Sequence, residues 1–277
     1  MIAPTVKEDG LLKGEQKRAI HKWDGEIKVS QDNVAIEKSL QLFIQQGNKR
    51  HLIGSLIATP INLRELAIGL LASENILKLD SSQLGQLKVE LDAHQIIVHI
   101  DAAIDFDMRM TEMAISSTPS CGWCGRTSIE EVIALLDGKI IPSNCIIEIA
   151  KLLEFTTTMA RTQIIFNNTG GVHAAAIFSQ AGELISLMED VGRHNAVDKA
   201  IGDTIINGKK MGEVLVLSGR AGMELIHKAA IAKVEIVISV GAPTTASIDL
   251  ARHAGISLLG FARDEGVNIY THPNRLI

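Results

Sequence analysis

Residues 213–263 read EVLVLSGRAGMELIHKAAIAKVEIVISVGAPTTASIDLARHAGISLLGFAR and are the most regular part of the chain. Runs of Val, Ile and Leu alternate there with segments whose apolar residues recur at helical spacing. The expected order is strand 213–220, helix 223–233, strand 234–243, helix 245–255 and strand 256–264. Apolar β-branched strands joined by helices predict right-handed crossovers and a parallel sheet, so we expect this third of the chain to be α/β.

The chain upstream of this region predicts a mixture of helices and strands. Apolar side chains recur at helical spacing over 61–77, and residues 87–101 alternate in polarity on either side of a turn, as a hairpin does. Further strands are expected over 162–168, 171–179 and 182–188, and further helices over 127–138 and 193–206. We therefore expect a smaller α+β N-terminal domain, residues 1–125, and an α/β domain, residues 126–277, with a mixed, largely parallel sheet.

Composition places the chain among ordinary globular proteins, with 277 residues that are 46% hydrophobic and 21% charged. The N-terminus has no apolar core of a secretory signal, and no window approaches about 18 consecutive apolar residues, so we expect a cytoplasmic protein without a membrane span. Three cysteines, an odd number, argue against a secreted disulfide scaffold. The net charge of −5 offers no general basic field for nucleic acid, so an anionic ligand would need locally placed Arg and Lys.

The segment SSTPSCGWCGRTS holds Cys121 and Cys124, three positions apart. A structural zinc site usually takes four ligands, and the remaining Cys145 lies alone among apolar residues, where a buried small side chain is expected. The zinc deaminases carry a Glu two residues after a His, but Ala175 stands at that distance from His173, so deaminase chemistry is disfavoured. The sequence gives no indication of a tightly held protein metal.

The two thiols precede a predicted helix that begins with a capping box made by Ser128 and Glu131. The N-terminus of that helix and the nearby Arg126 would lower the pKa of the thiols. A thiolate suits disulfide exchange and equally suits any nucleophilic role, and Gly122 and Gly125 would give the loop freedom to move. The alternative is that a glycine-rich loop merely joins two domains and that its cysteines are inert.

Three predicted strands end in loops that carry glycine, at 218–222, 241–245 and 260–266. In an open parallel sheet, ligands bind beyond the carboxyl ends of the strands. Backbone N–H groups beside these ends, together with Arg220 and Arg263, would form an anion site, which points to a phosphate-bearing ligand such as a nucleotide. The competing interpretation is that each glycine only ends its strand.

The segment EDVGRHNAVDKAIG, residues 189–202, places His194 and Asp198 four positions apart on a predicted helix, where they could form an oriented imidazole–carboxylate pair. Arg193 adds positive charge at the start of this helix. Periodicity alone favours a solvated amphipathic face for the helix. His173, on a predicted strand of small residues, is expected to be structural.

Taken together, several segments resemble one family, the formate dehydrogenase accessory sulfurtransferases (FdhD). The matching segments are SCGWCG, FNNTGGVHAAAIF, EDVGRHNAVDKAIG, LSGRAGMELIHKAA, GAPTTASIDLA and LLGFARDEGVNIYTHPNRL, with TPINLRELAIGLLASENIL nearer the N-terminus. They span nearly the whole chain in the expected order. Departures are small: GAPT stands at 241–244 where the family usually has Ser-Ala-Pro-Thr, and ENI at 74–76 where it has Glu-Gly-Ile.

The resemblance implies a sulfur relay in the cytoplasm. Members of this family take persulfide sulfur from a cysteine desulfurase and pass it to the molybdenum bis(molybdopterin guanine dinucleotide) cofactor that the catalytic subunit of formate dehydrogenase requires. Carried onto this chain, the resemblance implies that Cys121 bears the persulfide and that Cys124 assists. It also implies a cytidine-deaminase-like fold for the α/β domain and a homodimer.

The resemblance further assigns cofactor binding to GFARDEG and, with it, to the other strand ends. The expected cofactor-binding residues are Gly260, Phe261, Ala262, Arg263, Asp264, Glu265, Arg220, Ser218, Arg193 and His194. Arginines at these ends would explain how a net-acidic protein holds an anionic guanine dinucleotide.

Two other functions stay open at this point. A CxxC thiol–disulfide oxidoreductase would cycle Cys121 and Cys124 between thiol and disulfide without any dependence on Arg220 or Arg263. A non-enzymatic nucleotide-cofactor chaperone would use only the strand ends, and its thiols would be incidental.

Overall fold

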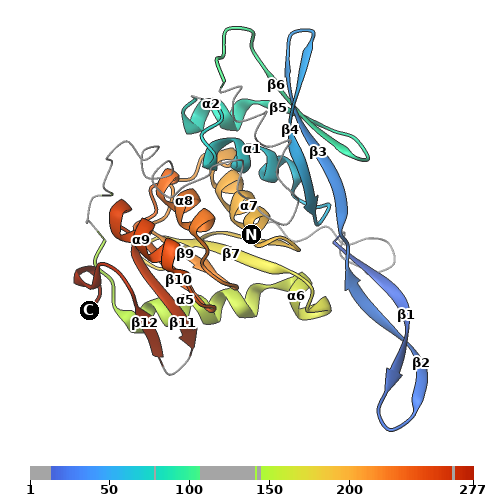
Figure 1. The fold of residues 1–277 in the computed structure, drawn as a ribbon, viewed down its shortest axis with the longest axis vertical. Helices are drawn as coiled ribbons and strands as arrows, with labels where there is room; N and C mark the ends of the chain where they lie inside the picture. Colours follow the sequence, from blue (N-terminus) through green and yellow to red (C-terminus); the bar gives the residue numbers. More distant parts are fainter. Residues whose placement is uncertain (1–13, 78, 107–140, 142–144, 264–265) are drawn as a thin grey trace.

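The computed structural model describes residues 14–77, 79–106, 141, 145–263 and 266–277. These residues form a two-stranded arm, a four-stranded sheet, a six-stranded sheet and the helices that pack on them (Figure 1). The predicted helix over 127–138, the thiol segment and the predicted domain boundary at residue 125 lie outside the described residues. No helix in the described ranges is long and apolar enough to span a membrane.

The six-stranded sheet has the strand order β12-β11-β10-β9-β7-β8. Its strands are β7 (His173–Phe178), β8 (Leu184–Asp190), β9 (Val214–Leu217), β10 (Ile236–Ser239), β11 (Ser257–Arg263) and β12 (Gly266–Ile269). The parallel trio β9, β10 and β11 confirms the prediction drawn from the last third of the chain. The remaining three pairs are antiparallel. The sheet is therefore mixed as predicted, but the prediction that most of its strand pairs are parallel is wrong. Too few residues separate β7 from β8, and β11 from β12, to form the crossover that a parallel pair needs.

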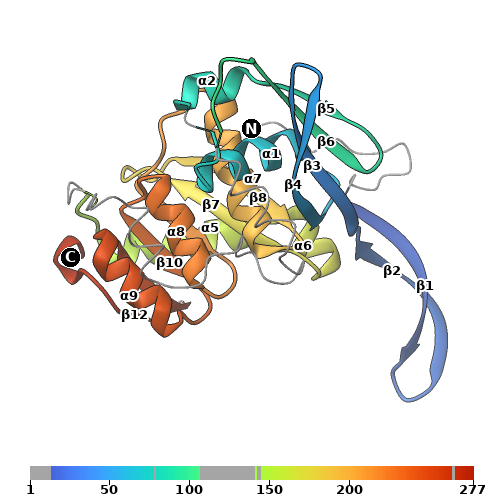
Figure 2. The same cartoon turned by 45° about the horizontal axis from the view of Figure 1, so that its top comes forward.

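Helices cover both faces of this sheet (Figure 2). Helix α5 (Ile149–Thr162) packs on one face, and α7 (Arg193–Ile206), α8 (Met223–Ile231) and α9 (Thr245–Ala254) pack on the other. The side chains of β7 alternate between the two cores: Ala174 and Ala176 face α5, whereas Ala175 and Ile177 face α7. Strands β9 and β10 are buried along their whole length, which is why their sequences are continuous apolar runs.

The N-terminal part adds a second sheet on the far side of α7. Its elements are β3 (Lys38–Gln46), β4 (Lys49–Ala58), α1 (Leu63–Ser73), α2 (Ser81–Gln86), β5 (Lys88–Leu91) and β6 (Gln95–Ile100), with the strand order β4-β3-β6-β5. Helix α1 confirms the helix predicted over 61–77, and the antiparallel pair β5–β6 confirms the hairpin predicted over 87–101. One apolar core joins this sheet and α1 to α7 and the six-stranded sheet.

Helices α1 and α7 approach so closely that glycine is needed on both. A Cβ atom added at Gly69 would overlap the backbone carbonyl of Asp198, and one added at Gly202 would overlap the backbone carbonyl of Glu65. Helix α7 is therefore enclosed between α1 and the six-stranded sheet, and residues 195–205 are all buried. The expectation of a solvated face on this helix is wrong for that reason.

The strand predicted over 162–168 is also wrong, because these residues finish α5 and form α6 (Ile164–Thr169). The carboxylate of Glu189, on β8, lies at the start of α6. It accepts hydrogen bonds of 2.8–2.9 Å from the backbone N–H groups of Ile164, Ile165 and Phe166. Tertiary capping of these donors overrides the β propensity of the Ile-Ile-Phe run.

Strands β1 (Glu15–Trp23) and β2 (Ile27–Ala35) form a separate two-stranded ribbon, which we call the arm. The arm projects away from both sheets (Figure 1). Its register is regular from the pair Glu15↔Ala35 at the base to Trp23↔Ile27 at the tip. The base packs on α6, where Ala35 contacts a small cluster formed by Ile165 and Val172.

A candidate anion site at the carboxyl edge of the sheet

The loops that follow the parallel strands are tied together at one edge of the six-stranded sheet. Ser239, the last residue of β10, donates from its Oγ to the backbone carbonyl of Gly219, at 2.5 Å, and to that of Gly241, at 3.2 Å. The backbone N–H of Phe261, in β11, donates to the carbonyl of Gly241 at 3.0 Å. The three strand ends expected to bind a ligand thus share one edge.

Strand β7 brings His173 to the same edge, because β7 runs antiparallel to β9 and begins where β9 ends. Ser218 joins the two strands: its N–H donates to the carbonyl of Ala174 at 3.1 Å, and its Oγ accepts from the N–H of Ala174 at 2.8 Å. The imidazole of His173 lies against Gly219, where a Cβ atom would stand 3.0 Å from Nδ1. A larger residue at position 219 would crowd the ring.

Positive charge gathers around this histidine. Burial lowers the pKa of His173 below its ordinary value, and the electrostatic effects of the neighbouring Arg193, His194 and Arg220 lower it further. Arg193 and His194 are the first two residues of α7, and Arg220 lies in the loop after β9. His173 is therefore uncharged at neutral pH, while the two arginines keep the surroundings electropositive.

Glu224, in the first turn of α8, is the acidic member of the group. Its Oε2 lies 3.7 Å from Nε2 of His194, which is too far for a hydrogen bond and close enough for an ion pair when the imidazole is protonated. The contact with His194 holds the pKa of Glu224 below its ordinary value, against the effect of burial. Within the described residues, Nε of Arg193 and Nε2 of His194 are buried without a hydrogen-bond partner. The buried Nε–H of Arg193 is a charged donor without a hydrogen-bond partner in that part of the chain, which suits an anionic ligand.

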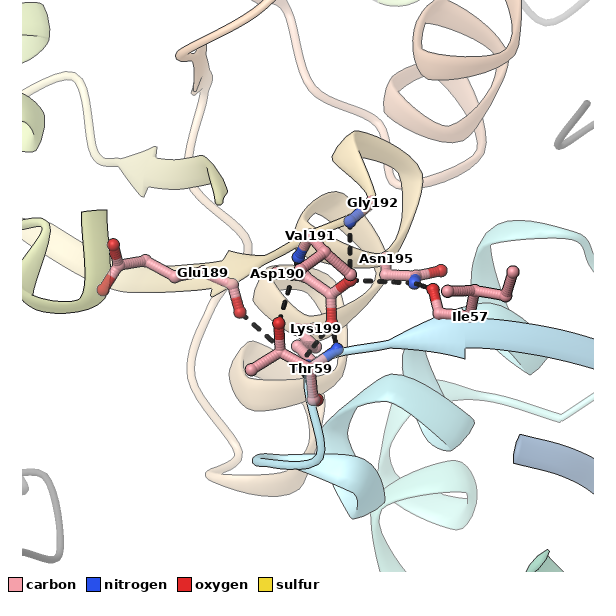
Figure 3. A network of polar contacts seen from close by, with 8 residues as sticks. All are labelled: Ile57, Thr59, Glu189, Asp190, Val191, Gly192, Asn195 and Lys199. Carbon is pink, nitrogen blue, oxygen red and sulfur yellow. Dashed lines mark hydrogen bonds and ion pairs between the residues drawn. The ribbon is translucent and has the colours of Figure 1, made fainter. Parts of the chain in front are cut away.

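A buried network holds the turn that leads into α7 (Figure 3). The carboxylate of Asp190 lies 2.6 Å from Nζ of Lys199, and both side chains are 0% exposed. The same carboxylate accepts from the N–H of Thr59 at 3.0 Å, from the N–H of Gly192 at 2.8 Å and from Nδ2 of Asn195 at 2.9 Å. Asp190 thus fixes residues on either side of Arg193.

Thr59, which follows β4, connects this network to the N-terminal sheet. Its hydroxyl accepts from the N–H of Val191 at 3.1 Å, and its carbonyl accepts from Nζ of Lys199 at 3.0 Å. Burial lowers the pKa of Lys199, although the nearby Asp190 opposes the effect. The position of the first turn of α7 therefore depends on a residue 131 positions before Asp190 in the chain.

Phe261 marks the β11 end of the edge. Its φ of +56° lies in the left-handed region, which is unfavourable for an aromatic residue, and its side chain is 43% exposed. The register of β11 with β12 shifts between Gly260 and Arg263. A Cβ atom at Gly260 would come 2.7 Å from Cδ of Pro243, and Ala262 is buried in the core on the α5 side. Phe261 and Arg263 are thus the residues of this segment that are exposed at the edge.

The described members of the predicted cofactor site therefore lie along one edge of the sheet. Four of the predicted residues, namely Cys121, Cys124, Asp264 and Glu265, lie outside the described residues. The hypothesis of a His194–Asp198 pair is wrong, because Asp198 is buried against Ser73, at 2.6 Å, and Lys228, at 2.8 Å. His194 faces Glu224 instead.

Cys145 confirms the prediction of a buried small side chain, since it is 1% exposed and carries a free thiol. Burial, aided by the negative charges of Glu235 and Glu213, raises the pKa of this thiol to about 11. A thiol with that pKa is not a nucleophile at neutral pH. In the part of the chain that the structure describes, no three His, Cys, Asp or Glu side chains gather as metal ligands.

Sequence reasoning misses two members of the site, His173 and Glu224. A strand of small residues predicts a structural role for His173, because the sequence alone does not indicate the antiparallel direction of β7. That direction is what brings the first residue of β7 to the edge where β9 ends. Glu224 lies two residues after SGRAG, in the first turn of the helix that starts at that edge. This position next to a predicted ligand-binding loop is the feature of the sequence that indicates a place in the site.

Comparisons with known proteins agree with one another over nearly the whole chain. Residues 35–277 match the FdhD/NarQ family. The sulfur carrier protein FdhD of Picrophilus torridus is 36% identical over 279 residues, covering 100% of both chains, and that of Thermoplasma acidophilum is 38% identical over 283 residues, covering 100% of this chain and 98% of the relative. The crystal structure of a putative formate dehydrogenase accessory protein from Desulfotalea psychrophila superposes with a TM-score of 0.69 at 20% identity, covering 95% of this chain and 98% of that one.

Proposed function

The chain belongs to the FdhD/NarQ family, and from this we propose that it is a sulfurtransferase working through a cysteine persulfide. It takes sulfur from a cysteine desulfurase and delivers it to the molybdenum bis(molybdopterin guanine dinucleotide) cofactor needed by formate dehydrogenase. The cofactor is the recipient of sulfur and is bound only for delivery. We expect the protein to act in the cytoplasm as a homodimer.

The observation that carries the cofactor-binding part of this proposal is the buried Nε of Arg193, which has no hydrogen-bond partner within the described residues. Arg193 and Arg220 both lie near His173 at the carboxyl edge of the sheet and make the surroundings electropositive. Guanine dinucleotides carry pyrophosphate groups, and charge-assisted hydrogen bonds from guanidinium and imidazole groups are strong ligands for such oxygens. The exposed aromatic ring of Phe261 at the same edge suits stacking on a base.

Loading of the carrier needs only thiolate chemistry. The thiolate of Cys121 attacks the outer sulfur of the persulfide on the donor, the sulfur–sulfur bond of the donor breaks, and the donor cysteine leaves as a thiolate. The outer sulfur then forms part of a persulfide on Cys121, with no net change in oxidation state.

Release of that sulfur as sulfide takes two electrons, which Cys124 can provide. Attack of the Cys124 thiolate on the inner sulfur of the Cys121 persulfide expels hydrosulfide and leaves a disulfide between the two cysteines. An external thiol then reduces this disulfide before the next cycle. In this scheme the disulfide is a by-product of sulfur delivery and not the main activity, which separates it from a thiol–disulfide oxidoreductase.

Mass spectrometry tests the loading step. The protein is incubated with a cysteine desulfurase and free cysteine, and we expect the addition of one sulfur mass. Cys121→Ala should abolish this addition, whereas Cys145→Ala, which removes a buried thiol of high pKa, should keep it. A Cys121→Ala variant that still restores formate dehydrogenase activity would overturn the assignment of the persulfide.

Calorimetric titration with GDP tests the binding site. Replacing Arg193 or Arg220 by Met should weaken binding by about tenfold or more, because each change removes a charged hydrogen-bond donor. Arg252→Met is a matched control, since Arg252 is exposed on α9 and forms an ion pair with Asp249 at 3.0 Å, one turn away on the same helix. Equal GDP affinity in all three variants would argue for the oxidoreductase. If Cys121→Ser fully supports formate dehydrogenase while the arginine variants do not, the protein is a cofactor chaperone.

A further inference from the structure

Glu224 brings a negative charge into the candidate anion site. It lies in the first turn of α8, just after the loop that carries Arg220, and its side chain is 19% exposed. A carboxylate in the first turn stabilises its own helix, and that role alone would call for no partner from elsewhere. Glu224, however, also faces another helix, since Nε2 of His194, on α7, lies 3.7 Å from its Oε2. The carboxylate therefore lies between the starts of two helices.

The groups near this carboxylate are those that would hold an anionic ligand. The contact with His194 has the largest effect in lowering the pKa of Glu224, and the backbone N–H of Glu224 and the charge of Arg193 act in the same direction, against the effect of burial. The carboxylate is thus close to an imidazole, a guanidinium and an N–H group at a helix start. A phosphate group binds well to the same three kinds of partner.

The carboxylate satisfies these groups only in part. At 3.7 Å its contact with His194 is too long for a hydrogen bond, and Nε of Arg193 has no hydrogen-bond partner within the described residues. A carboxylate that completed charged hydrogen bonds to both groups would be difficult to displace. One that leaves a buried guanidinium nitrogen unsatisfied can give way to an anion that satisfies it.

A second pair of side chains, one helical turn deeper, fixes the position of Glu224. Asp198 lies four residues after His194 on α7, and four residues correspond to about one turn. Lys228 lies four residues after Glu224 on α8. Oδ1 of Asp198 is 2.8 Å from Nζ of Lys228, and both side chains are buried. Because α7 and α8 both begin at the carboxyl edge, this inner pair keeps Glu224 level with His194.

We propose that Glu224 is a built-in competitor for the anionic ligand: its carboxylate holds the place beside Arg193 and His194 that a phosphate group of the ligand takes, and it moves aside on binding. The inference rests on the proposed cofactor site, whose ligand is bound only for delivery. Differences in affinity between related complexes lie mostly in the dissociation rate, so a pyrophosphate held by arginines without an opposing charge would leave slowly. A nearby like charge lowers the affinity and thereby favours release.

Calorimetric titration with GDP and, separately, with inorganic pyrophosphate tests this competition. Glu224→Gln keeps the size of the side chain and removes its charge, so the affinity for both ligands should rise by about fivefold or more. Glu213→Gln is the matched control, because Glu213 is 20% exposed and its Oε1 lies 3.2 Å from Nζ of Lys210. Glu213 directly precedes β9 and so lies at the opposite edge of the sheet, and its replacement should leave both affinities unchanged.

Thermal unfolding separates competition from a structural role. Saturating GDP should raise Tm by a larger increment in Glu224→Gln than in the wild type, because stabilisation by a ligand grows with its affinity. A glutamate with only a structural role would lower Tm equally with and without GDP, so the two increments would be the same.

The possible outcomes distinguish this inference from the proposed function. If the wild type binds GDP and Glu224→Gln binds it no more tightly, the inference fails and the proposed function stands. A loss of GDP affinity with unchanged pyrophosphate affinity would overturn the inference by showing that the carboxylate accepts hydrogen bonds from the guanine base. Absence of binding in both proteins would overturn it together with the cofactor site on which it rests.

Discussion

Replacing Lys199 by Met tests whether the buried network below the candidate site is as important as its geometry indicates. The change keeps the length and apolar stem of the side chain and removes only the ammonium group. It leaves the fully buried carboxylate of Asp190 without its cation and removes the donor that satisfies the carbonyl of Thr59.

The expected loss follows from the contacts that remain. Removing one partner of a buried ion pair typically costs about 3–5 kcal/mol of unfolding free energy. Asp190 keeps three N–H donors, from Thr59, Gly192 and Asn195, which places the expected loss near the lower end, about 3 kcal/mol. At roughly 2–4 °C per kcal/mol for a chain of this size, Tm should fall by about 6–12 °C.

Urea unfolding followed by circular dichroism measures the loss, with Lys210→Met as the control. The side chain of Lys210 is 88% exposed and its Nζ lies 3.2 Å from Glu213, so losing that ion pair should cost less than about 1 kcal/mol. Because the network fixes the turn before Arg193, GDP affinity should also fall in Lys199→Met and not in Lys210→Met. If the two variants are equally stable, the network does not hold the turn and the reasoning fails.

Three further predictions concern other parts of the core. Lys228→Met leaves Asp198 buried without its cation, so urea unfolding at pH 7 should show a loss of about 3–5 kcal/mol. Burial raises the pKa of Asp198 and Lys228 lowers it, so removing Lys228 raises the pKa further. Asp198 then takes up a proton at a higher pH in the variant than in the wild type, so the stability deficit of Lys228→Met should shrink as the pH falls from 7 to 5; an equal deficit at both values would contradict this. Cys145→Ala should leave the initial rate of persulfide loading unchanged between pH 7 and 9, since the pKa of this thiol is about 11; a slower rate would show that the thiol takes part. Gly202→Ala should lower Tm more than any surface change, because the added Cβ overlaps the backbone carbonyl of Glu65; a Tm within about 2 °C of wild type, less than about 1 kcal/mol, would refute the close contact of α1 and α7.

Local sequence patterns predict the elements whose apolar spacing matches their burial in the fold. Strands β9 and β10 are apolar throughout because both faces are covered, and the bounds of α7 coincide with the helix predicted over 193–206. The rule that ligands bind at carboxyl ends of parallel strands also places Ser218 and Arg220 on the edge where they lie.

The errors come from contacts between residues far apart in the chain. The side chains of Asp198 and Lys199 suggest a solvated helix face, yet Asp198 bonds to Ser73, 125 positions away, and Lys199 to Thr59, 140 positions away. Similarly, the carboxylate of Glu189 turns a β-prone segment into a helix. No local window contains such partners, and for the same reason periodicity does not assign His173 to the site.

The enclosure of α7 between α1 and the six-stranded sheet has a consequence for how the protein is synthesised. Ser73, at the end of α1, bonds to Lys228, 155 residues later, so a ribosome must add all of these residues before α1 can complete its contacts. At about 5–20 residues per second, the contact of Ser73 with α8 forms roughly 8–30 s after α1 has been synthesised. Over that interval the nascent chain presents a helix that chaperones can bind, and a chain terminated before α8 would remain a substrate for proteolysis.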